Sequence, residues 1–160
     1  MNPNTVVLTD LPGVIPLIAA NIKLNTLVNA SLKTKLIDCF MPMAYSWGDP
    51  IAGIEYFTDA DIIIASDVIY SPEAYEPLAY SLHHLLKPRD AVRGDGSTAI
   101  HHSKPPLCIL AHRHRHPEDF KFFTIMNSDK NIVIVEVFLR SPIYESVFSD
   151  VKIFMLTWVE

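Results

Sequence analysis

The chain alternates short apolar runs with longer segments whose apolar residues recur at helical spacing. We predict that the short runs are strands and the longer segments helices. Strands that alternate with helices are typical of a parallel sheet covered on both faces, and the last two strands could form an antiparallel pair. The predicted strands are residues 6–9, 33–41, 61–66, 107–111, 132–139 and 151–159, and helices are predicted at 12–29, at 71–87 and from Pro117 onward.

Proline positions and apolar stripes define the predicted helices. Pro12 fits the first turn of the first helix, while Ser71 suits the N-cap and Pro72 the first position of the second helix. Apolar residues three and four apart then predict the buried side of each helix. The residues expected to face inward are Val14, Ile15, Ile18, Ile22 and either Leu27 or Val28 in the first helix, Tyr75, Leu78, Leu82, Leu85 and Leu86 in the second, and Phe120, Phe123 and Ile125 in the third.

The run 62–65 is the most informative of the apolar segments. It has no polar face, so it suits a strand that is covered on both sides. Ser66, Asp67 and Tyr70 follow it, at the strand end beyond which open α/β sheets bind their ligands. Asp67 could attract the cation of an amine nucleophile while the Tyr70 ring forms a wall of the site. The alternative is a capping aspartate beside a half-buried tyrosine.

Two residues nearer the N-terminus are candidates for binding a nucleotide-like cofactor. Asp10 ends the first predicted strand, where a carboxylate can accept hydrogen bonds from a ribose diol. The alternative is a solvated aspartate that caps the following helix. Trp47, in a loop with Gly48, could stack on an adenine-like ring, although a loop tryptophan is more often a packing residue.

Three histidines alternate at His112, His114 and His116. If this stretch is extended, their side chains point to one side, as in a metal-binding clip. However, no cysteine or carboxylate completes the set at an obvious spacing, and a loop is expected at this strand end. We therefore interpret the histidines as a polar, partly protonatable rim, and we predict no metal site.

The overall composition is that of one globular domain. The chain has 160 residues, of which 49% are hydrophobic and 19% charged, and its net charge of −5 argues against nucleic-acid binding. A signal segment and an apolar run of about 20 residues are both absent, so we predict a cytoplasmic protein without a membrane anchor. Cys39 and Cys108 form no disulfide or metal motif and are predicted to be reduced core residues. Residues 89–106 are predicted to be a polar surface insertion.

An ordered set of short motifs resembles a known family. The motifs are VVLTDLP at 6–12, NIKLN at 21–25, SWG at 46–48, ASDVIY at 65–70 and CILAHR at 108–113, followed by Phe122-Phe123 and the closing run 151–159. Together they resemble the family-16 methyltransferases, which are seven-strand, class I protein-lysine methyltransferases that depend on S-adenosylmethionine. The resemblance implies an α/β fold, namely a Rossmann-like three-layer sandwich with a mostly parallel sheet.

The resemblance also implies a role for each matching residue. Contacts to S-adenosylmethionine are implied for Asp10, Leu11, Trp47, Ala65 and Ser66, with Asp10 on the ribose hydroxyls and Trp47 beside the adenosine.

The implied catalytic pair is Asp67 and Tyr70, which match the family's Asp-x-x-Tyr motif where cofactor and substrate lysine meet. Arg113 is implied, more loosely, at the substrate rim. The chemistry would be in-line displacement at the sulfonium methyl, with a protein lysine as acceptor and no metal.

The chain departs from the family pattern at its N-terminus. The family's first strand and its Gly-rich turn should precede Val6, and they are expected between the strands at Val6 and Ile62. Without that strand, those two strands would expose unpaired edges or pair with each other, so a partner could supply the missing strand. Two functions therefore stay open for this truncated member, an active methyltransferase and a non-catalytic binding or regulatory module. A third interpretation, a nucleotide- or metal-dependent enzyme of another α/β family, depends on Asp10 and the histidines.

Overall fold

The computed structural model describes residues 5–28, 39–50, 60–88, 104–138 and 150–159. The chain forms two compact units, Met1–Asp49 and Pro50–Glu160. Most of the predicted insertion 89–106 lies outside the described residues. Within the described part, the longest helix has 14 residues, and no helix could cross a bilayer.

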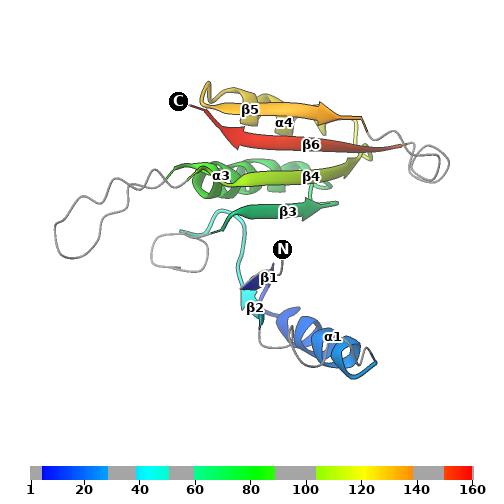
Figure 1. Ribbon diagram of the computed structural model, residues 1–160. Coiled ribbons are helices and arrows are strands. Elements are labelled where there is room, and N and C mark those ends of the chain that lie inside the picture. Colours follow the sequence, from blue (N-terminus) through cyan, green and yellow to red (C-terminus); the bar gives the residue numbers. More distant parts are fainter. Residues whose placement is uncertain (1–4, 29–38, 51–59, 89–103, 139–149, 160) are drawn as a thin grey trace, which may run out of the picture. The chain divides into compact units, whose positions relative to one another are not determined.

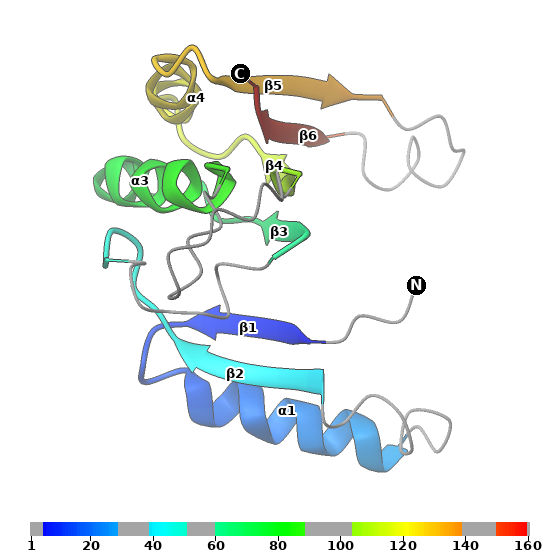
Figure 2. The same cartoon turned by 60° about the vertical axis from the view of Figure 1, so that its left-hand side comes forward.

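The first unit contains one strand–helix–strand motif. Strand β1 (Val6–Asp10) pairs in parallel with β2 (Phe40–Ala44), and helix α1 (Ile15–Val28) runs along this pair (Figure 2). The predicted stripe of α1 is confirmed from Val14 to Ile22, because Val14, Ile15, Ile18 and Ile22 are partly buried while their neighbours are exposed. The side chains of Leu27 and Val28 lie outside the described part.

Two predicted boundaries in this unit are wrong. Pro12 lies in a turn closed by the Val14 N–H and the Leu11 carbonyl, and the helix itself begins only at Ile15. The second strand was predicted at 33–41, but β2 continues to Ala44 and includes Pro42. In the described sheet β2 pairs with β1 alone, and such an edge strand tolerates a residue that lacks the N–H group.

The second unit contains a four-stranded mixed sheet (Figure 1). In chain order its elements are β3 (Ile62–Ser66), a 3₁₀ turn (Pro72–Ala74), α3 (Tyr75–Leu86), β4 (Leu107–Arg113), α4 (Phe120–Asn127), β5 (Ile132–Val137) and β6 (Val151–Trp158). The strand order is β3-β4-β6-β5, in which β3 and β4 are parallel while β6 runs antiparallel to both of its neighbours.

The α/β class is confirmed, whereas a mostly parallel sheet is not. Burial patterns alone do not reveal strand direction, and β6 lies between β4 and β5 in the opposite sense to both. The predicted antiparallel final pair is confirmed by the pairing of β5 with β6. In the described sheet of each unit, β1 has β2 as its one strand neighbour and β3 has β4.

Helices α3 and α4 pack on one face of the four-stranded sheet (Figure 2). Cys108, Leu110 and Leu156 point to this side and are fully buried, as are Leu86 of α3 and Phe122 of α4. Burial raises the pKa of the Cys108 thiol to about 12, in keeping with a reduced core cysteine. The buried side of α3 matches the prediction closely, since Tyr75, Leu78, Leu82 and Leu86 are all buried.

The predicted inward side of α4 is wrong for Phe120, which is exposed. The other two predicted residues, Phe123 and Ile125, are half-buried, and the fully buried residues are Phe122 and Met126. The helix starts at Phe120, three residues later than predicted, and its buried residues are four apart and so share one side.

The opposite face of the sheet carries an exposed apolar row. Its members are register partners across all four strands, Ile64, Ile109, Met155 and Val135. Ile64 is 78% exposed and Val135 is 52% exposed. The prediction that β3 is covered on both sides is therefore wrong, because a wholly apolar run does not show by itself how many faces are covered.

Because one face of the sheet is buried and the other exposed, truncating a side chain on each face should reduce the free energy of unfolding by different amounts. Leu110→Ala should lower the free energy of unfolding by about 2–5 kcal/mol because it opens a cavity in the core. Ile64→Ala should cost less than about 1 kcal/mol because the side chain is largely exposed. Urea denaturation of both variants measures the difference, and equal costs would show that the Ile64 face is covered in solution.

Candidate active site

The end of β3 has an uncommon backbone conformation at Asp67. With φ of 59°, it is the only non-glycine residue with positive φ in the described part of the chain. Its N–H donates to the Ala111 carbonyl at 3.0 Å, which extends the β3–β4 ladder by one residue. Strained residues that the surrounding structure holds in place are concentrated at functional sites, so the geometry marks this turn as a site candidate.

The predicted catalytic pair projects from this same turn. Ile69 is fully buried and anchors the turn, while the Asp67 side chain is 48% exposed and Tyr70 is 56% exposed. Ser66 is exposed at the strand end and Ala65 is buried beside it. Four of the predicted site residues thus belong to one segment at the carboxyl end of β3.

An arginine that the sequence interpretation missed contacts Asp67. Arg115 Nη2 donates to Asp67 Oδ2 at 2.8 Å, from the loop that follows β4. Arg113, which the resemblance placed loosely at the rim, instead forms an ion pair with Asp150, with Nε and Oδ2 2.8 Å apart. The strand ends between these arginines, and a spacing of two residues could not by itself reveal which one faces Asp67.

The loop after β4 is organised by the buried carboxylate of Asp119. Its Oδ1 accepts a hydrogen bond of 2.6 Å from the Tyr75 hydroxyl, and its Oδ2 accepts from the backbone N–H groups of Arg115 and His116 at 2.9 and 3.0 Å. Burial alone would raise the pKa of Asp119, but these hydrogen bonds outweigh it and hold the pKa below its ordinary value. Burial, together with the bond to Asp119, raises the pKa of the Tyr75 hydroxyl to about 12. The sequence interpretation placed Asp119 only at a helix start and missed this role.

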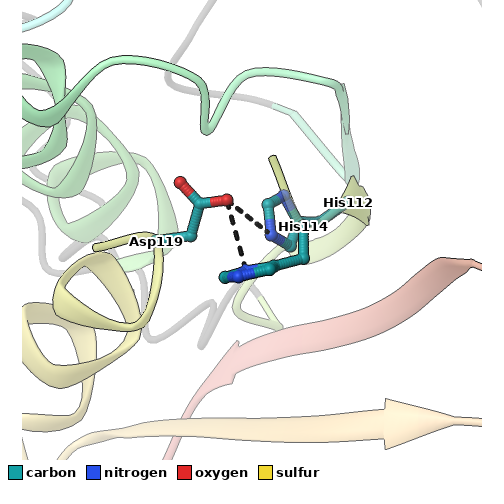
Figure 3. A group of neighbouring side chains, drawn as sticks. All are labelled: His112, His114 and Asp119. Carbon is teal, nitrogen blue, oxygen red and sulfur yellow. Dashed lines mark ion pairs between the residues drawn. The ribbon is translucent and has the colours of Figure 1, made fainter. Parts of the chain in front are cut away.

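Two histidines approach the same carboxylate oxygen (Figure 3). His112 Nε2 lies 3.6 Å and His114 Nδ1 3.4 Å from Asp119 Oδ2. His116 is separate, since its Nδ1 accepts from the Glu118 N–H. The predicted rim of three histidines is wrong for His112, which is only 4% exposed, and burial lowers its pKa.

The first unit brings its candidate residues to one end of the β1–β2 pair. The Tyr45 N–H donates to the Asp10 carbonyl at 2.9 Å, and a tight turn containing Trp47 follows Tyr45. Leu11 is exposed, and its N–H donates to Asp10 Oδ1 at 2.7 Å. Within the described residues Asp10 Oδ2 accepts no hydrogen bond. The exposed carboxylate can therefore accept a hydrogen bond from a hydroxyl group, as the predicted contact with a ribose requires.

A groove of about 700 Å³ lies elsewhere in the second unit, between α3 and α4. Its lining includes Tyr80, His83 and Asp129, and His83 Nδ1 lies 3.0 Å from Asp129 Oδ2. Asp67 and Tyr70 are not among its lining residues, so this groove is separate from the turn after β3.

Comparison with known proteins assigns the chain to a family. Residues 1–129 match the sequence profile of a family described as lysine methyltransferase. The chain belongs to this family. The matched residues include every candidate of the methyltransferase site, from Asp10 and Trp47 to Asp67 and Tyr70. No individual curated protein matches the chain significantly.

The Asp119 hydrogen bonds predict a measurable cost for losing one hydroxyl in this methyltransferase. Tyr75→Phe leaves Oδ1 of a buried carboxylate without its donor, so the free energy of unfolding should fall by about 1–3 kcal/mol. The control Tyr80→Phe removes a hydroxyl from a half-exposed residue of the same helix and should cost less than about 0.5 kcal/mol. If the two variants are equally stable in urea denaturation, the hydroxyl of Tyr75 does not support the buried charge.

Proposed function

We propose that this member of the lysine methyltransferase family is an S-adenosylmethionine-dependent protein-lysine N-methyltransferase. The observation that carries the proposal is the turn at the end of β3, where Asp67 in a left-handed conformation and the exposed Tyr70 flank the buried Ile69. Family membership supports methyl transfer, and the chemistry of these side chains supports an amine acceptor.

The residues proposed to contact the cofactor are those that the resemblance to the family implies. In the first unit, Asp10 would accept hydrogen bonds from the ribose hydroxyls, with Leu11 and the turn that contains Trp47 beside it. In the second unit, Ala65 and Ser66 would line the cofactor at the end of β3. When bound, S-adenosylmethionine supplies a methyl group on a positively charged sulfur.

Asp67 and Tyr70 would position the acceptor lysine. The carboxylate of Asp67 attracts the ammonium group, and the Tyr70 ring can contact the cation and exclude water from it. Desolvation lowers the pKa of a lysine, so the amine can lose its proton to solvent before it attacks. The amine nitrogen then forms its bond to the methyl carbon as the carbon–sulfur bond breaks, and the released electron pair stays on sulfur. Orientation of the two reactants accounts for most of the acceleration.

When no substrate is bound, the positive charge of Arg115 neutralises the negative charge of Asp67. Its guanidinium forms an ion pair with Asp67, and about half of each side chain is exposed. Exposed pairs of this kind contribute little to stability, so an incoming ammonium group can replace the guanidinium at small cost.

The proposal predicts that methyl transfer depends on the Asp67 charge. Asp67→Asn should reduce kcat/KM at least about tenfold, because the neutral amide attracts and orients the ammonium group less well. The measurement uses tritiated S-adenosylmethionine and a mixture of unfolded and native proteins as acceptors, with methyllysine identified after acid hydrolysis.

Asp61→Asn is the matched control, since Asp61 is also exposed and lies at the opposite end of β3. It should leave kcat/KM within about twofold of the unchanged chain. Methyllysine formation that is equally fast in both variants would contradict the role of Asp67. Transfer to another nitrogen would contradict lysine as the acceptor.

A further inference from the structure

The side-chain cluster of His112, His114 and Asp119 has a feature that hydrogen bonding does not explain. Neither ring nitrogen of the buried His112 forms a hydrogen bond of ordinary length to a described residue, because Nδ1 has no partner and Nε2 is 3.6 Å from Asp119 Oδ2. The other ring nitrogen, Nε2, is the one that faces Asp119, and it lies in a group with His114 Nδ1 (Figure 3).

The distances of the two histidine nitrogens from Asp119 Oδ2 fit a shared metal ion better than direct hydrogen bonds. The separations of 3.6 and 3.4 Å exceed the usual hydrogen-bond range of about 2.7–3.2 Å. Two ligands of a tetrahedral zinc ion with bonds of about 2.0–2.2 Å lie about 3.3–3.5 Å apart. All three ligand atoms lie within 4.8 Å of one another.

We propose that His112 Nε2, His114 Nδ1 and Asp119 Oδ2 bind a Zn²⁺ ion. Two imidazoles and one carboxylate form a donor set that suits this ion. His114 is 67% exposed, so the site is open to solvent on this side and a water molecule can occupy the fourth position.

The surrounding structure holds the carboxylate ligand in place. Tyr75 and the backbone N–H groups of Arg115 and His116 fix the orientation of Asp119, as outer hydrogen bonds commonly do for metal-binding carboxylates. His112 belongs to β4 and Asp119 directly precedes α4, so a bound ion would tie the strand to the helix start. The same loop carries Arg115, which contacts Asp67, so the ion would also stabilise the loop beside the proposed lysine site.

The test is metal binding by the full chain after treatment with a chelator. Co²⁺ reports on the coordination directly, because a tetrahedral Co²⁺ site absorbs strongly in the visible range. We expect one equivalent of Co²⁺ to produce this absorption and Zn²⁺ to displace it. Zn²⁺ should also raise the melting temperature.

Matched histidine variants locate the site. His114→Asn should weaken Zn²⁺ binding at least about tenfold and abolish the rise in melting temperature, and it should fold normally because the residue is exposed. His84→Asn and His83→Asn, on helix α3, should change the affinity by less than about twofold.

Two results would overturn the proposal. One is a chain that is folded by circular dichroism but shows no saturable Zn²⁺ binding and no Co²⁺ absorption. The other is a His114→Asn variant that binds Zn²⁺ as tightly as the unchanged chain. The binding assay contains neither cofactor nor acceptor protein, so its outcome is independent of whether the chain transfers a methyl group.

Discussion

The loop between β4 and α4 depends on the hydrogen bonds that the buried carboxylate of Asp119 accepts. An isolated charge in this position would be costly, yet Asp119 is only 1% exposed and lies against two histidines. Its hydrogen bonds join α3, through Tyr75, to the loop between β4 and α4, through two backbone N–H groups. One side chain thereby fixes the direction in which the chain leaves β4, and the position of α4 follows from it.

That fixed loop connects the core to the candidate active site. Arg115 uses its backbone N–H to bind Asp119 and its guanidinium to bind Asp67. Asp67 is further held through its own N–H, which continues the β3–β4 ladder, and through the burial of Ile69. The unusual backbone of Asp67 is thus supported from two sides, which is the condition under which such strain persists.

Much of this arrangement could be predicted from local sequence patterns. Residues 62–66 and the buried side of α3 have clear signatures, because a run of β-branched apolar residues is typical of a strand and a helical stripe results from burial. The candidate residues at the ends of β1 and β3 could also be identified, since the carboxyl ends of parallel strands are where such folds bind ligands.

Long-range contacts account for what the sequence did not reveal. The position of β6 between β4 and β5, and the exposure of Ile64, depend on strands that are distant along the chain. The role of Asp119 depends on Tyr75, which lies 44 residues away. Arg115 could not be distinguished from Arg113 for a similar reason, because the partners of both, Asp67 and Asp150, come from other strands or their ends.

The proposed function requires that this member of the lysine methyltransferase family binds S-adenosylmethionine. Calorimetric titration of the full chain with S-adenosylhomocysteine, the reaction product, tests it most directly. We expect one site with micromolar affinity, lost in Asp10→Ala and retained in Asp49→Ala, which removes another exposed carboxylate of the same unit. A chain that is folded by circular dichroism yet releases no heat of binding would contradict the claim.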